Sequence, residues 1–73
     1  MTIPDAPPRF EQAIADYDAV LARNPRASGS LYGRGLARLR LQNDPEGSRA
    51  DLAAAKALDP GVAAEFASYG LSE

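Results

Sequence analysis

The sequence has 73 residues with 8 basic and 10 acidic side chains, a net charge of −2, and neither cysteine nor histidine. This length allows a single domain near the lower size limit for a self-sufficient hydrophobic core. Without cysteine there are no disulfides or thiolate metal sites, and without histidine the commonest metal ligand and acid–base residue is missing. We therefore expect no enzyme, no metal and no cofactor. The net negative charge also disfavours a nucleic-acid partner.

Neither a membrane span nor an export signal is visible in the sequence. No apolar run approaches the roughly 20 residues that cross a bilayer. The start, "MTIPDAPP", lacks the basic region and the apolar run of a signal peptide. We expect a cytoplasmic protein with no membrane partner.

The first seven residues are polar and proline-rich, and we expect them to be flexible, with a helical domain over residues 8–73. Asp5, or the two prolines that follow it, can start a first helix, and Pro25 ends it. Apolar residues recur along this helix at spacings of three and four, which is one face of an amphipathic helix. They are Phe10, Ala13, Ile14, Tyr17, Val20 and Leu21.

A second helix is predicted from about Ser30 to Gln42, with Ser28 or Ser30 as its N-cap. Read alone, the stretch "LARLRLQND" alternates as a strand would, but its neighbours favour the helix. Gly33 and Gly35 lie inside it, and each costs roughly 1 kcal/mol relative to alanine. Such a cost suggests that another backbone packs closely against this helix.

The third and fourth helices each begin at an Asp-Pro pair. Asp44 is a good N-cap, Pro45 suits the first helical position, and the pattern continues to Leu58. Asp59 and Pro60 repeat this arrangement before a short helix that carries Val62, Phe66 and Tyr69 on one face and stops at Gly70. Short connections between four helices predict an all-α chain whose neighbouring helices are antiparallel.

The chain contains an internal repeat. "AIADYDAVLARNP" over residues 13–25 aligns with "SRADLAAAKALDP" over residues 48–60, and Pro25 and Pro60 lie 35 residues apart. A period in this range is typical of stacked helix pairs. Leu31 and Gly35 occupy the large and glycine positions of the first helix, and the second-helix pattern appears twice. Its two copies are Ala13, Tyr17, Val20 and Pro25, and then Ser48, Leu52, Ala55 and Pro60.

With these residues the chain resembles the tetratricopeptide repeat family over roughly residues 9–69, as about one and a half repeats with a C-terminal capping helix. Arg34 and Arg38 replace the usual leucine and tyrosine, and the first repeat lacks its first helix. The period is one residue longer than usual, and we place the extra residue at the turn after the second helix. There we predict that Gln42 extends the helix, that Asn43 is left-handed, and that the strained turn favours helix exchange between chains.

The resemblance implies a concave surface that holds a partner helix or peptide. The expected partner-binding residues are Tyr32, Leu36, Leu39 and Arg40. Leu36 and Leu39 can equally complete the core. Arg34 and Arg38, together with Arg40, can form an anion-binding patch. Alternatively they form ion pairs within the fold, with Asp16, Asp18, Asp51 or Glu46 as the candidate partners, or simply form a solvated helix face.

The first helix is expected to pack on the second through Phe10, Ile14, Tyr17 and Leu21. In a full repeat the same helix also packs on the helix that is missing here. Its remaining apolar surface can be covered by the proline-rich start, by another copy, or by the rest of a longer repeat array. Of these we predict self-association as a homo-oligomer, with a helix-exchanged dimer as one form. The sequence thus predicts a protein-interaction or assembly module, and the alternative is a purely structural oligomerising block with no ligand.

Overall fold

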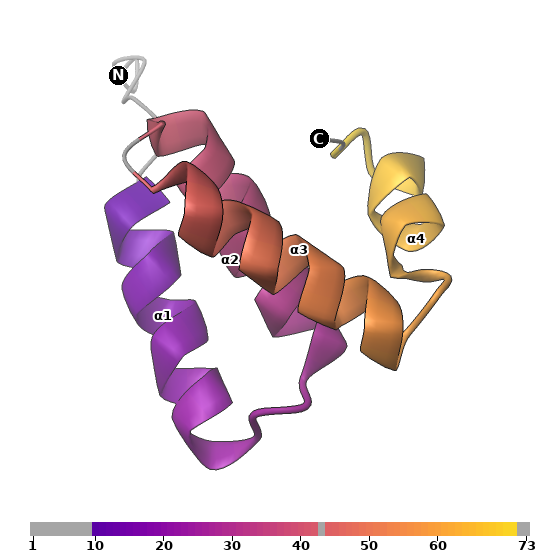
Figure 1. Ribbon diagram of the computed structural model, residues 1–73, viewed down its shortest axis with the longest axis horizontal. Helices are drawn as coiled ribbons and strands as arrows, with labels where there is room; N and C mark the ends of the chain where they lie inside the picture. The colour runs from indigo at the N-terminus through magenta and orange to yellow at the C-terminus, as the bar shows by residue number, and fades with distance from the viewer. Residues whose placement is uncertain (1–9, 43, 72–73) are drawn as a thin grey trace, which may run out of the picture.

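The computed structural model describes residues 10–42 and 44–71, and within these ranges it contains four α-helices and no strand (Figure 1). They are α1 (Phe10–Arg23), α2 (Ser28–Leu41), α3 (Pro45–Leu58) and α4 (Val62–Ser68). The prediction of an all-α fold is confirmed. The proline-rich segment over residues 1–7 and the predicted start of the first helix lie outside the described residues.

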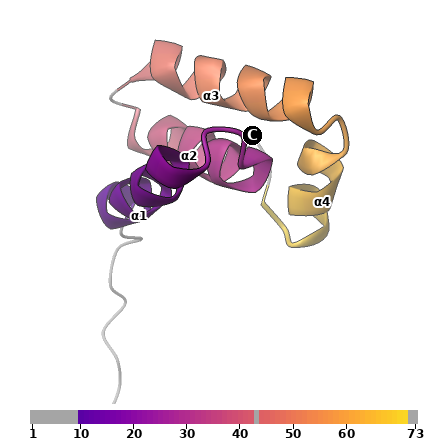
Figure 2. The same cartoon turned by 90° about the horizontal axis from the view of Figure 1, so that it is seen from below.

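Helix α2 lies at the centre of the molecule. It packs against α1 on one side and α3 on another, while the short α4 contacts α2 and α3 (Figures 1 and 2). Consecutive long helices reverse direction, and α4 crosses the end of the α2–α3 pair (Figure 2). Helix α1 therefore packs on α2 alone among the described helices, which leaves much of its surface uncovered.

The core forms where α2 meets the other three helices. Its buried members come from all four helices, and Tyr32, Ala55 and Val62 are almost completely inaccessible to solvent. The full set is Leu21, Leu31, Tyr32, Leu36, Leu52, Ala55 and Val62. Because one helix supplies three of these residues, α2 organises the whole fold.

The two glycines inside α2 both allow a close approach. A Cβ on Gly35 would lie 2.8 Å from Cγ of Leu52 and 3.1 Å from the carbonyl oxygen of Ser48. The Ser48 hydroxyl donates a 2.8 Å hydrogen bond to the carbonyl oxygen of Gly35. The predicted close backbone packing is therefore confirmed at Gly35. At Gly33 a Cβ would overlap the ring of Tyr17, so there the neighbour is a side chain.

Helix α2 begins at Ser28, earlier than predicted, and neither Ser28 nor Ser30 caps it. The N-cap is Ala27, which makes no side-chain cap hydrogen bond. The reason lies in the preceding turn: the side-chain oxygen of Asn24 accepts from the backbone of Arg26 at 3.2 Å, and its carbonyl accepts from Ala27 at 3.1 Å. This turn brings the chain back into helix before Ser30 is reached.

The turn after α2 also differs from the prediction. Helix α2 ends at Leu41, and Gln42 is left-handed with φ 58°, so Gln42 does not extend the helix. Its backbone N–H bonds the carbonyl oxygen of Arg38 at 3.0 Å, which satisfies one of the helix's last acceptors. Asn43 lies outside the described residues. Asp44 caps α3 as predicted, accepting from the backbone of Gly47 at 2.9 Å.

The start of α4 differs from the prediction, whereas its end agrees with it. Asp59 does not cap α4: it ends α3, and its side chain accepts from the backbone of Gly61 at 3.0 Å, so α4 begins only at Val62. At the other end, Gly70 is left-handed with φ 80°. Gly70 and Leu71 donate to the carbonyl oxygens of Ala67 and Phe66 at 2.9 and 3.0 Å, which is the Schellman pattern of a helix C-terminus.

Candidate interaction groove

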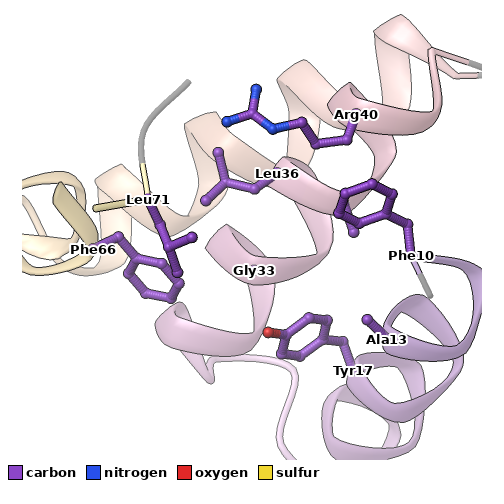
Figure 3. A pocket seen from close by; sticks show the side chains of 9 residues that line it. Phe10, Ala13, Tyr17, Gly33, Leu36, Arg40, Phe66 and Leu71 are labelled. Carbon is purple, nitrogen blue, oxygen red and sulfur yellow. The ribbon is translucent and has the colours of Figure 1, made fainter. Parts of the chain in front are cut away.

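An apolar groove lies between α1, α2 and the end of α4, and we call it the α1/α2/α4 groove (Figure 3). It has a volume of about 190 Å³. Its lining comes from all three elements: Phe10, Ala13 and Tyr17 from α1, Gly33, Leu36, Ala37 and Arg40 from α2, and Phe66 and Leu71 from α4 and the residues after it.

The wall on the α1 side follows from helix periodicity. Phe10, Ala13 and Tyr17 lie three and four residues apart, so they share one face of α1. The ring of Tyr17 lies against Gly33, where α2 has no side chain to hold α1 away. The small side chains of Ala13 and Ala37 leave the space between the larger ones empty, and the groove is therefore a consequence of small residues on two facing helices.

The wall on the α4 side depends on the end of that helix. The Phe66 ring packs on the Tyr32 ring with 4.7 Å between their centroids and an interplanar angle of 52°. The Schellman turn at Gly70 then brings Leu71 into the same lining as Phe66. In this motif the residue after the glycine commonly contacts the residue that accepts its hydrogen bond.

The groove is apolar with one positive charge. Among its described lining residues Arg40 is the charged one, and its side chain extends along the groove's edge above Leu36 (Figure 3). Pockets for small molecules usually have volumes of about 300–1,000 Å³, and this one, about 190 Å³, is smaller. An apolar cavity of about 150 Å³ holds one benzene molecule. The groove therefore suits one large side chain better than a whole small ligand.

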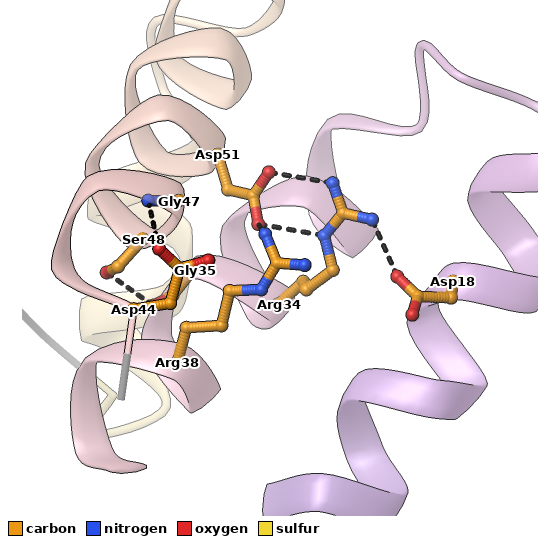
Figure 4. A network of polar contacts seen from close by, with 8 residues as sticks. All are labelled: Asp18, Arg34, Gly35, Arg38, Asp44, Gly47, Ser48 and Asp51. Atoms are coloured by element: carbon orange, nitrogen blue, oxygen red, sulfur yellow. Dashed lines mark hydrogen bonds and ion pairs between the residues drawn. The ribbon is translucent and has the colours of Figure 1, made fainter. Parts of the chain in front are cut away.

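In contrast to the apolar groove, a polar network joins α1, α2 and α3 on the other side of α2 (Figure 4). Arg34 donates two hydrogen bonds of 2.8 and 2.7 Å to Asp51 and a third of 2.6 Å to Asp18. Arg38 donates to the same Asp51 carboxylate at 2.9 Å. We call these four residues the Asp51 network. The hydrogen bonds that Arg34 donates to the Asp51 carboxylate raise the pKa of its guanidinium above the usual range, so this side chain stays charged.

The Asp51 network bears on the roles that the sequence left open for Arg34 and Arg38. Of these alternatives, ion pairing within the fold is the one observed, with Asp18 and Asp51 as the partners. The Asp51 side chain is only 7% exposed, and a buried carboxylate needs such compensation. These two arginines therefore stabilise the packing of three helices and do not line the groove.

The remaining predicted partner-binding residues divide between surface and core. Leu36 and Arg40 line the groove. Tyr32 is only 1% exposed, because Phe66 of α4 covers it, so it supports the groove from below and offers no contact surface. Leu39 is half-buried and lies outside the groove lining.

The predicted self-association residues also lie in different places. Phe10 and Tyr17 line the groove, whereas Leu21 is buried in the core. Ile14 is half-buried and borders a different, shallow and more polar cleft beside Glu11 and Arg38. The predicted site did not include Ala13, Ala37, Phe66 or Leu71. The stop signal at Gly70 could have indicated Leu71, because a Schellman turn brings the following residue back onto its helix.

Two other kinds of feature are absent from the described part of the chain. Over residues 10–42 and 44–71, no group of acidic side chains is arranged to hold a metal ion. None of the helices in these ranges has the length and apolar character needed to cross a membrane.

The fold and the groove define a small all-α helical protein with an apolar surface groove. Comparisons with protein-family models, with curated proteins and with solved structures find no significant match to this chain. Its function is therefore inferred from its own residues.

Proposed function

We propose that this chain is a non-enzymatic protein-interaction module that takes apolar side chains of a partner helix or peptide into the α1/α2/α4 groove. The observation that carries the proposal is the groove itself, which is apolar, open and bounded by three elements. Removing such a surface from water on binding is favourable, and contiguous apolar patches commonly mark interfaces.

Three further features support an interaction role. Helix α1 packs on α2 alone among the described helices, so its groove-facing side has no covering helix. Val20 on the same helix is 45% exposed, although it belongs to the apolar stripe. The resemblance to the tetratricopeptide repeat, whose concave surface holds a partner helix or peptide, is the third.

The partner's chemistry follows from the lining. A large apolar side chain would fill the space above Ala13 and Ala37, and a carboxylate or hydroxyl next to it would lie within reach of Arg40. Hydrogen bonds from a guanidinium to an anionic group are stronger than neutral ones. We therefore expect bound peptides to carry a bulky apolar residue followed or preceded by a polar acceptor.

A selection of random peptides on the immobilised protein tests this proposal. Ala13→Phe fills the groove from α1, and Ala15→Phe is the matched control, because Ala15 is exposed on the same helix and does not line the groove. Peptides selected on the wild type should bind Ala13→Phe at least tenfold more weakly and Ala15→Phe equally well. A selection that yields no peptide sensitive to Ala13→Phe would contradict the proposal.

The alternative is a structural building block that associates with itself and binds no other ligand. Exposed apolar residues favour it: Tyr69 is 72% exposed and Leu71 48%. In that case the selection would return no groove-dependent peptide, while the protein would still form a defined oligomer in light scattering.

A further inference from the structure

The aromatic residues of this chain are unevenly distributed. The sequence contains three tyrosines and two phenylalanines. Three of them, Phe10, Tyr17 and Phe66, line the groove, and Tyr32 lies beneath Phe66. The fifth, Tyr69, is 72% exposed, more than any other large apolar side chain in the described residues. One aromatic ring is thus left in water, while the others line the groove or lie beneath its wall.

Tyr69 belongs to the same short segment as two residues of the groove's wall. It follows α4 directly, one helical turn after Phe66 and two residues before Leu71, and both of these residues line the groove. Leu71 is itself 48% exposed. The segment that forms one wall of the groove therefore also carries an exposed ring.

The size and polarity of the groove match a tyrosine side chain. Its volume of about 190 Å³ exceeds the roughly 150 Å³ in which an apolar cavity holds a benzene ring. One ring fits in this space. Tyrosine is an apolar ring with a polar tip, and Arg40 at the groove's edge can donate to a phenolic oxygen.

We propose that a second copy of this chain supplies the occupant: Tyr69 of each copy enters the α1/α2/α4 groove of the other in a two-fold symmetric dimer. Each copy carries both the exposed ring and the groove, so a two-fold arrangement lets the same contact form twice. This inference rests on the proposed function, since it names the occupant of the same groove.

The available area sets the expected strength of the dimer. A standard interface buries about 800 Å² per partner, which is about 15% of the 5165 Å² accessible surface of this chain. Two inserted rings and the flanking Leu71 residues form a smaller contact than this. Because small interfaces are weak and transient, we expect a dissociation constant on the order of 10–100 µM.

Sedimentation velocity over a concentration series tests the proposal with two interrupting variants. Tyr69→Ala removes the projecting ring at an exposed position that the fold does not need, and Ala13→Phe fills the groove. Each should weaken dimerisation at least tenfold. Tyr69→Phe keeps the ring and should still dimerise. Leu58→Ala is the control, because Leu58 is 44% exposed at the end of α3 and does not line the groove.

Mixing the two variants gives a sharper result. Ala13→Phe retains Tyr69 but has no open groove, whereas Tyr69→Ala retains the groove but has no ring. Neither variant can form a contact with itself, but the mixed dimer can form one of the two wild-type contacts. Labelled Ala13→Phe should therefore associate with Tyr69→Ala more strongly than either variant with itself.

Several results would overturn the proposal. They include wild-type protein that stays monomeric at several hundred micromolar, dimerisation that Tyr69→Ala leaves unchanged (as a helix-exchanged dimer would), and a variant mixture with no restored association. A chain that dimerises only after residues 1–8 are removed would assign the groove to its own N-terminal segment. The two proposals fail separately: a monomeric wild type that still binds peptides through the groove would refute the dimer and keep the proposed function.

Discussion

The two sides of α2 differ in how completely they are filled. Toward α3, Gly35 lets the backbone approach Ser48, Leu52 fills the contact, and the Asp51 network closes it with ion pairs. On its groove side, Gly33 lies against the ring of Tyr17 from α1, but the space beside Ala37 stays open as part of the groove. Small residues therefore allow tight packing where a large side chain of the neighbouring helix fills the space, and leave a groove where none does.

The largest effect on stability is expected when the α2–α3 interface loses a core residue. Leu52 is only 5% exposed and contacts Gly35 across the α2–α3 interface. Leu52→Ala should lower the free energy of unfolding by about 2–5 kcal/mol, because it removes buried surface and leaves a cavity. A chain of this size has little stability to lose. Urea unfolding followed by circular dichroism should show a lost or strongly shifted transition, and a loss under about 1 kcal/mol would contradict this packing.

The next effect concerns the Asp51 network. Asp51→Asn should lower the free energy of unfolding by about 2–3 kcal/mol, because two arginines lose their shared counter-ion at a buried position. Asp16→Asn is the matched control on the exposed surface of α1, and it should change stability by less than about 0.5 kcal/mol. Equal stabilities of the two variants would show that the network does not hold the three helices together.

A smaller effect on stability, of opposite sign, is expected at the turn between α2 and α3. Gln42 is left-handed, a conformation that costs roughly 1–2 kcal/mol for residues with a Cβ. Gln42→Gly removes this strain but adds freedom to the unfolded chain, so we expect a net gain of about 0.5–1 kcal/mol. Thermal unfolding measures it. Gln42→Ala keeps the strain and should not gain stability.

The smallest effect on stability should come from the open side. Leu71 is 48% exposed, so Leu71→Ala should change the free energy of unfolding by less than about 1 kcal/mol. The same change removes part of the groove wall and should weaken binding of groove-selected peptides several-fold. Isothermal titration and urea unfolding together separate the two roles. A large loss of stability would mean that Leu71 belongs to the core.

Helix boundaries show where reasoning from the sequence succeeded and where it did not. Asp44 and Gly70 were predicted correctly, because each acts through hydrogen bonds to its immediate neighbours. Ser30, Gln42 and Asp59 were misassigned. Their positions depend on how Asn24 folds the preceding turn and on how the connections between packed helices close.

The candidate site was predictable only in part, for a related reason. Helix periodicity placed Phe10 and Tyr17 on one face of α1, and both line the groove. It could not show that Phe66 covers Tyr32, nor that Arg34 and Arg38 point to Asp51 while Arg40 lines the groove. These facts depend on contacts between residues that are far apart in the chain.

The sequence by itself determined that the chain is all-helical and where most of its turns fall, because apolar periodicity, proline and aspartate caps act within a few residues. The tertiary structure alone decided which face of α2 is filled and which is open. Both faces carry small residues and arginines. The outcome depends on which side chains the neighbouring helices bring there, since α3 brings Asp51 and Leu52 to one face, whereas α1 and α4 leave a space between their side chains on the other.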